Sequence, residues 1–161
     1  MTSETGHEVL GLQLSVGDHI CGFYRKPAER DDILIPFLVE GLKAGDKCTC
    51  VVDSCTPGHV LASMSEHIEV EPYVSVSQLE VLDSDGTYLA GGGFLPERML
   101  RFWEAKARQG PCAAGPGFTR NIADMSWAHR SQGAVADLIG YESELNRIMS
   151  NFPQVNLGPM T

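Results

Sequence analysis

The chain has 161 residues, of which 43% are hydrophobic and 20% are charged, a composition typical of a single globular domain. Its formal net charge of −9 argues against a nucleic-acid surface, because phosphate binding needs a surplus of Lys and Arg. No run of about 18 apolar residues predicts a membrane span, and residues 1–17 lack the pattern of a signal peptide, so we expect a cytoplasmic protein.

The first part of the chain predicts a strand, a loop and a helix. Residues 18–24 have the apolar and β-favouring content of a strand. A proline and several charges interrupt residues 25–30, which predicts a loop. Apolar residues at i, i+3 and i+4 spacing then predict a helix over 32–44, capped by Asp31 or Asp32.

A buried strand and a second helix follow. The nearly continuous apolar run over 47–53 is typical of a strand in a parallel sheet. Thr56 fits a helix N-cap with Pro57 at the first helical position, so we expect a short helix to about Glu66. Alternating apolar residues predict the next strand within 74–83.

The glycines at 91–93 predict a loop, and the helix after it ends near Gln109. Residues 112–119 have room for an irregular strand. We expect residues 120–130 to form a polar loop or a short helical turn.

A long helix over about 131–151 and a short strand over 155–157 complete the pattern. Strands that alternate with helices predict an α/β fold, a three-layer sandwich with a mainly parallel central sheet. We expect one domain over 15–161 after an N-terminal extension over 1–14.

Ligands of such sheets bind beyond the carboxyl ends of the strands. The loops that we expect to carry a site are therefore 24–30, 53–56, 83–93 and 119–129.

Several short motifs occur in an order that resembles the MEDS domain, the sensory module of DcmR-type regulators. The resemblance covers roughly residues 15–157 and depends on His19–Tyr24, Phe37–Asp46, Gly93–Phe94, Arg120, Asp124–Ala128 and Tyr141–Asn146. Asp124 stands where the pattern of the family has Glu before Met-Ser-Trp.

The resemblance implies a RecA- or KaiC-like core without a functional phosphate loop, and no G-x-x-x-x-G-K-[ST] motif occurs here. It also implies a non-enzymatic sensor of a simple hydrocarbon derivative in prokaryotic signal transduction or transcription regulation. We expect no attached output domain unless this chain is a fragment of a larger regulator, so the expected partner is a separate signalling protein, either kinase-like or a transcription regulator.

The motifs and the side-chain chemistry together indicate nine candidate ligand-binding residues. They are His19, Cys21, Tyr24, Arg120, Asp124, Met125, Trp127, Tyr141 and Glu142.

His19 and Cys21 are two residues apart, so both side chains leave the same face of their strand. Cys48 and Cys50 share a face of another strand, and four such groups could hold zinc if the strands were neighbours. Core packing is the alternative that we favour, since C-x-x-C spacing is absent, and we predict no metal site. Five cysteines in all leave an odd number, which predicts free thiols.

Glu142 is predicted to lie within the apolar face of the last helix. That face comprises Val135, Leu138, Ile139, Leu145 and Met149. A buried carboxylate needs a partner, for which Arg120 and the His19 ring are the candidates, unless it anchors a ligand. Trp127 has two open roles as well, the wall of an apolar pocket or a packing contact for its loop.

No catalytic motif such as G-x-S-x-G or H-E-x-x-H occurs, so we expect no enzyme. The alternative function is a degenerate nucleotide-binding protein or residual ATPase, with Arg25 and Lys26 on the phosphates. A third is a ligand-free interaction module. No cofactor is identified, and a homodimer is a further option.

Overall fold

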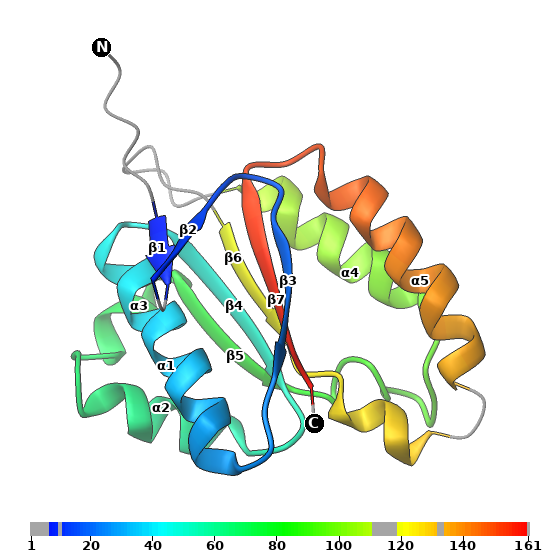
Figure 1. Ribbon diagram of the computed structural model, residues 1–161, viewed down its shortest axis with the longest axis horizontal. Coiled ribbons are helices and arrows are strands. Elements are labelled where there is room, and N and C mark those ends of the chain that lie inside the picture. Colours follow the sequence, from blue (N-terminus) through cyan, green and yellow to red (C-terminus); the bar gives the residue numbers. More distant parts are fainter. Residues whose placement is uncertain (1–6, 10, 111–118, 132–133, 161) are drawn as a thin grey trace.

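Five parallel strands form the central sheet of the protein (Figure 1). The computed structural model describes residues 7–9, 11–110, 119–131 and 134–160. The spatial order of the strands is β3-β7-β6-β4-β5. Their bounds are β3 His19–Phe23, β4 Lys47–Val52, β5 Leu79–Asp83, β6 Thr119–Ala123 and β7 Gln154–Met160. The prediction of an α/β fold with a parallel central sheet is confirmed.

Helices cover both faces of this sheet, which makes three layers (Figure 1). Helices α1 (Pro27–Lys43), α2 (Pro57–Ser65) and α3 (Glu71–Ser75) lie on one side. Helices α4 (Pro96–Gln109) and α5 (Ala134–Met149) lie on the other. The 3₁₀ helix η1 (Ser126–Arg130) follows β6, and β1 (His7–Val9) pairs with β2 (Leu12–Leu14) in a separate antiparallel hairpin. Of the helices in the described part of the chain, none has the length and apolarity needed to cross a membrane.

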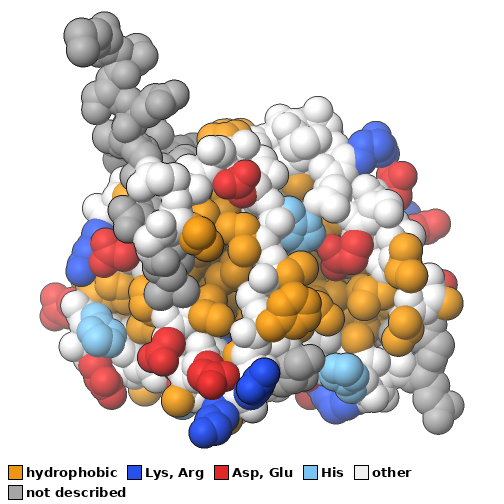
Figure 2. Space-filling model, in the orientation of Figure 1, with side chains coloured by type: hydrophobic (Ala, Val, Ile, Leu, Met, Phe, Trp, Pro, Cys, Tyr) orange, Lys and Arg blue, Asp and Glu red, His pale blue; other side chains and the backbone are white. Residues whose placement is uncertain are grey.

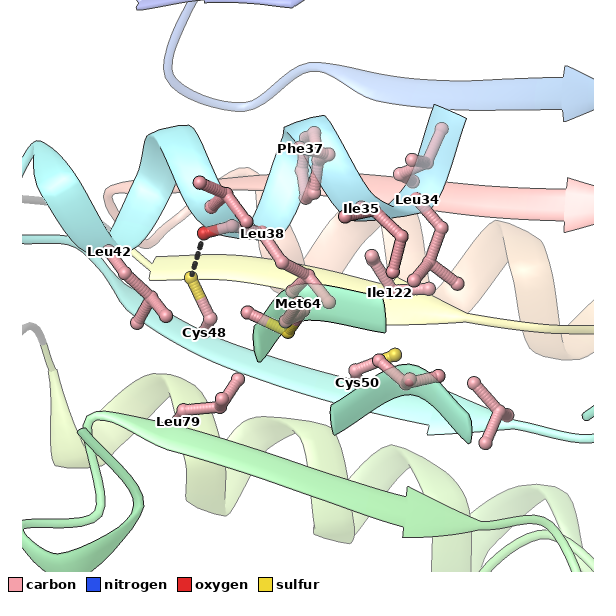
Figure 3. Packing of buried hydrophobic residues seen from close by; sticks show 14 of the residues in the cluster. Leu34, Ile35, Phe37, Leu38, Leu42, Cys48, Cys50, Met64, Leu79 and Ile122 are labelled. Atoms are coloured by element: carbon pink, nitrogen blue, oxygen red, sulfur yellow. Dashed lines mark hydrogen bonds between the residues drawn. The ribbon is translucent and has the colours of Figure 1, made fainter. Parts of the chain in front are cut away.

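The residues of β4 alternate between the two hydrophobic cores. Cys48, Cys50 and Val52 pack under α1 and α2, whereas Val51 packs against the layer of α4 and α5. The Cys48 thiol lies 3.8 Å from the carbonyl oxygen of Leu38 in α1, as Figure 3 shows. This strand is buried on both faces, which is why its apolar run is continuous.

Helix α1 begins earlier than predicted. It starts at Pro27, because a proline at the first helical position loses no hydrogen bond. The expected loop over 25–30 and the expected cap at Asp31 or Asp32 are therefore wrong. Helix α2 matches its prediction, since the Thr56 hydroxyl accepts a 3.1 Å hydrogen bond from the backbone N–H of His59.

Two other expectations need correction. The strand expected within 74–83 is confined to β5, because the short helix α3 and a left-handed turn at Ser77 (φ 58°) precede it. For residues 120–130 a polar loop or a short helical turn was expected: the helical turn is present as η1, but residues 120–123 belong to β6. Buried hydrogen-bond partners allow the polar residues Arg120 and Asn121 in the middle of the sheet. The strand expected over 112–119 lies, apart from Thr119, outside the described residues.

Helix α1 approaches β6 closely at Gly41. A Cβ atom added there would lie 2.6 Å from Cδ and 2.8 Å from Nε of Arg120. Arg120 cannot move aside easily, because its Nε donates a 2.7 Å hydrogen bond to the buried carboxylate of Asp46. Only glycine allows this helix to lie against that ion pair.

We predict that Gly41→Ala lowers the free energy of unfolding by about 1–3 kcal/mol, because overpacking displaces the ion pair. Gly140→Ala is the matched control, since Gly140 lies in helix α5 and its added Cβ meets no atom within 4 Å. The control is expected to gain up to about 1 kcal/mol from helix propensity. Urea titrations that show equal stability for the two variants would contradict the close contact.

Candidate functional site

A cavity of about 410 Å³ lies between the sheet and helix α5. Residues of β3, β6 and β7 form its floor, and α5 contributes most of its wall. Figure 2 shows hydrophobic side chains at the surface of this face of the molecule, between the β3 edge of the sheet and α5. The lining residues are His19, Cys21, Trp103, Asn121, Ala123, Met125, Leu138, Glu142, Leu145, Asn146, Met149, Asn156, Leu157, Gly158 and Met160. The cavity thus covers the face of the sheet and is not confined to the loops at its carboxyl edge.

A row of polar side chains crosses the sheet at this cavity. His19 of β3 is in register with Asn156 of β7, Asn156 with Asn121 of β6, and Asn121 with Thr49 of β4. Residues in register on neighbouring strands present their side chains to the same face. The three residues nearest the β3 edge, His19, Asn156 and Asn121, line the cavity.

Hydrogen bonds orient the amides of this row. Gln154 Nε2 donates to the carbonyl oxygen of Met149 at 3.0 Å, so its Oε1 faces the sheet. Asn121 Nδ2 donates to this Oε1 and to Asn156 Oδ1, both at 3.0 Å. These bonds assign which atom of each amide is the nitrogen and which is the oxygen. The atom at the other end of each amide is therefore assigned as well.

The opposite ends are buried polar atoms that lack a protein partner within the described residues. They are Asn121 Oδ1, an acceptor, and Asn156 Nδ2, a donor. The two residues are only 2% and 7% exposed. Both atoms are themselves buried, so they lie beneath the surface of the cavity and are not open to it.

Glu142 and His19 form the rim of the cavity. Glu142 Oε2 lies 3.7 Å from His19 Nε2, and His19 Nδ1 lies 2.6 Å from Asn146 Oδ1. Burial raises the pKa of Glu142 above its ordinary value, and the nearby His19 ring opposes that shift. Of the two partners expected for Glu142, the structure provides His19.

The apolar face predicted for α5 is wrong in part. Val135 and Ile139 are 65% and 71% exposed, whereas Tyr141, Leu145 and Met149 are buried. The buried face is therefore rotated, and Glu142 lies at its border instead of its centre.

The structure brings four of the nine predicted site residues to this cavity. His19, Cys21, Met125 and Glu142 line it. The other five, which do not line it, are Tyr24, Arg120, Asp124, Trp127 and Tyr141.

Trp127 and Tyr141 belong to a buried aromatic cluster. The Trp127 ring stacks on Tyr88, with centroids 4.9 Å apart and an angle of 24°, and lies 4.6 Å from Phe94. The hydroxyl groups of Tyr141 and Tyr88 are 3.1 Å apart, and Trp103 Nε1 donates to Tyr88 Oη at 2.9 Å. Trp127 therefore packs its loop onto the sheet, the second of its two expected roles.

Arg120 and Tyr24 also have structural contacts. The Arg120 side chain lies under α1, where Nη1 donates to the carbonyl oxygen of Phe37 at 3.0 Å. Tyr24 is buried, and its hydroxyl lies 3.3 Å from Ser126 Oγ.

Asp124 accepts five hydrogen bonds from its own chain. Its Oδ2 accepts from the N–H groups of Asp53 and Ser54 and from Ser54 Oγ, at 3.1, 2.8 and 2.5 Å. Its Oδ1 accepts from the N–H and hydroxyl of Ser126, at 3.0 and 2.7 Å. Burial alone would raise the pKa of Asp124, but the hydrogen bonds from Ser54 and Ser126 lower it. This carboxylate ties the loop after β4 to η1.

The zinc alternative for the cysteines is incompatible with this fold. Two strands separate β3 from β4, which places them roughly 14 Å apart. Cys48 and Cys50 also face α1, whereas His19 and Cys21 face the cavity. Within residues 7–160 as described, no group of three or more metal-ligating side chains occurs.

The start of α1 is the position expected for a phosphate. There, the backbone N–H groups of Arg25 and Lys26 donate to Glu29 Oε2 at 2.7 and 3.3 Å. A carboxylate of the chain itself thus occupies the donors that an anion would need.

Sequence reasoning did not identify Asn121 and Asn156 as floor residues. A signal was present for Asn156, because Gln154–Leu157 alternates polar and apolar residues with period two, whereas Thr119–Ala123 begins with three polar residues in succession. Such alternation predicts a strand with one polar face.

The fold is a three-layer α/β domain with a cavity under its last helix, and the comparison with known families gives the class of protein. The chain belongs to the family described as "MEDS: MEthanogen/methylotroph, DcmR Sensory domain", whose family model matches residues 18–158. The resemblance found in the motifs is confirmed. Since this is a family of sensory domains, the chain has a regulatory sensor role.

One curated relative is the "Transcriptional repressor DcmR" of Methylorubrum extorquens (strain DSM 6343 / CIP 106787 / DM4). It is 27% identical over 164 residues, which cover 93% of this chain and 54% of the repressor. The chain therefore spans about half the length of this relative.

We predict that Asp124→Asn lowers the free energy of unfolding at pH 7 by about 2–3 kcal/mol, because an amide cannot accept all five hydrogen bonds. The pKa of Asp124 is lowered from 3.8 in the folded protein, so its contribution is full above that value and is lost as pH falls through the folded pKa. The variant should therefore lose less stability than the wild type below about pH 4.

Thermal unfolding from pH 2 to pH 7 measures this difference. Asp137→Asn, which removes an exposed carboxylate from α5, is the control and should follow the wild-type curve. Parallel curves for the wild type and Asp124→Asn would contradict the assignment.

Proposed function

We propose that this domain is a non-enzymatic sensor that binds a small organic molecule in the cavity beneath α5 and signals to a separate regulatory protein. The observation that carries the proposal is the cavity itself, with amide side chains in its floor and apolar side chains in its walls. Membership of a family of sensory domains supports it. The repressor among its relatives supports an output in transcription regulation, in the cytoplasm.

Helix α5 is the element best placed to transmit a signal. Its inner face contributes Leu138, Leu145 and Met149 to the cavity, while Val135 and Ile139 are exposed on the helix. If the molecule binds more tightly when α5 is in one of two positions, its binding favours that position. The surface that a partner contacts then changes. The change in population is limited by the difference in affinity between the two states.

The parallel sheet fits the expected relation to RecA- and KaiC-like cores. Nucleotide binding gains no support from the start of α1, where Glu29 occupies the backbone donors. Mg-ATP is therefore the negative control in the ligand-binding test.

We predict that Gly158→Leu blocks the site without unfolding the domain. Gly158 alternates with Asn156 and Met160 along β7, so a side chain there points into the cavity. Its added Cβ would be 3.7 Å from the nearest atom, the carbonyl oxygen of Ala123, which is an ordinary contact.

The measurement is a thermal-shift screen of small alcohols, amides, ketones, haloalkanes and Mg-ATP. At a hundredfold excess over Kd, a bound compound should stabilise the wild type by about 2.7 kcal/mol, and Gly158→Leu should lose this gain. Gly22→Leu is the matched control, because Gly22 faces a separate apolar cavity of about 130 Å³ on the other side of β3. A compound that stabilises both variants equally would place its site elsewhere.

A further inference from the structure

Strand β3 is an edge of the sheet, and one of its sides is free. It pairs with β7 and with no other strand in the described part of the chain. The carbonyl oxygen of Asp18 and the N–H of Tyr24 both form hydrogen bonds with β7, at 2.9 and 3.0 Å. The backbone groups of successive residues point to alternate sides of a strand, so those of His19, Cys21 and Phe23 point away from β7.

The β3 edge lacks the features that normally prevent a second strand from pairing. Its five residues include no proline and no Lys, Asp or Glu, and Cys21 and Phe23 are exposed. The other edge strand, β5, differs, because its Glu80 forms ion pairs with Lys47 and Lys106. Charged side chains on an edge strand discourage pairing with another molecule. Of the two edges, β3 is therefore the unprotected one.

Apolar side chains extend from this edge over the neighbouring helix. Phe23 is 73% exposed, and Val135 and Ile139 are exposed on α5. Figure 2 shows hydrophobic side chains at the surface along β3 and over α5. A surface of this kind is typical of contact between protein molecules.

The β3 edge is complementary to a second copy of itself. A two-fold axis at the free side of β3 makes the two copies of the strand antiparallel. Residues whose backbone groups point outward must face one another, so full overlap of the five residues places Cys21 opposite Cys21 and His19 opposite Phe23. The exposed Phe23 ring then lies beside an imidazole ring, which is a favourable cross-strand pair.

The charges at the two ends of β3 favour the same antiparallel arrangement. Asp18 precedes the strand, whereas the exposed residues Arg25 and Lys26 follow it. Antiparallel overlap brings the acidic end of each copy next to the basic end of the other. A parallel arrangement would instead place Asp18 beside Asp18, and like charges on neighbouring strands are destabilising.

We propose that β3 is the contact of a symmetric homodimer, in which two five-stranded sheets join edge to edge through antiparallel β3 strands centred on Cys21. The dimer contact adjoins the cavity under α5, because His19 and Cys21 also line that cavity. This proposal concerns a different surface from the proposed ligand site, and it does not depend on which compound binds there.

Analytical ultracentrifugation of the whole chain, over a concentration series from low to several hundred micromolar, tests the proposal. The wild type should become a dimer within this series. Phe23→Lys places a charge on the edge and should weaken the dimer at least about thirtyfold, since the change occurs twice across the axis. The Phe23 side chain is exposed, so the variant should fold as a monomer.

Val76→Lys is the matched control. Val76 is 66% exposed and follows α3, which lies against β5 at the other edge of the sheet. This variant has the same change in charge and hydrophobicity and should keep the wild-type dimer.

Cys21 itself reports the register of the two strands. The Cα atoms of a hydrogen-bonded antiparallel pair are about 5.5 Å apart, so a short bis-maleimide should join the two copies through Cys21. Cys21→Ser should abolish this covalent dimer and retain the dimer seen by ultracentrifugation.

A wild type that remains monomeric throughout the concentration series would overturn the proposal. A dimer that Phe23→Lys leaves intact, or that both Lys substitutions weaken equally, would do the same. A dimer that the bis-maleimide does not join through Cys21 would place the contact on another surface.

Discussion

The middle strand β6 places polar side chains in the buried centre of the sheet. The packing of the elements around β6 depends on supplying hydrogen-bond partners for these side chains. Arg120 and Asn121 lie within β6, and Asp124 follows directly, all three almost fully buried. Burying such groups without partners costs several kcal/mol each. Arg120 forms an ion pair with Asp46 under α1. Asp124 accepts hydrogen bonds from the loop after β4 and from the start of η1. Only Asn121, whose partners are other amides, retains an unpaired atom.

The two faces of the sheet differ in their packing. On the α1 side the glycine at 41 lets the helix close on a satisfied ion pair, so the layer is compact. On the α5 side, Ala123 and Gly158 leave space beside a polar row, so the layer contains a cavity. The face under α1 is thus closed around an ion pair, whereas the face under α5 contains a cavity lined by His19, Asn121 and Asn156.

Sequence patterns correctly predicted the elements that depend on residues close to one another in the chain. The apolar run of β4 and the cap formed by Thr56 and Pro57 were predicted correctly, because continuous burial and capping depend on neighbouring residues. Residues 120–123 of β6 were predicted as a loop or helical turn, since Arg and Asn in a central strand are stable only with partners 74 and 35 residues away. Among the predicted site residues, His19 and Glu142 meet at the cavity, whereas Trp127 and Asp124 have structural contacts.

The sequence by itself determined the α/β class, the alternation of strands and helices and the family, because periodicity and short motifs are properties of consecutive residues. The tertiary structure alone decided the strand order, the faces on which the cysteines lie and the residues that floor the cavity. These depend on which strands become neighbours and in what register, and the register of β3, β7 and β6 unites His19, Asn156 and Asn121. Hydrogen bonds across that register join Asn121 to Gln154 and Asn156, and no linear pattern predicts them.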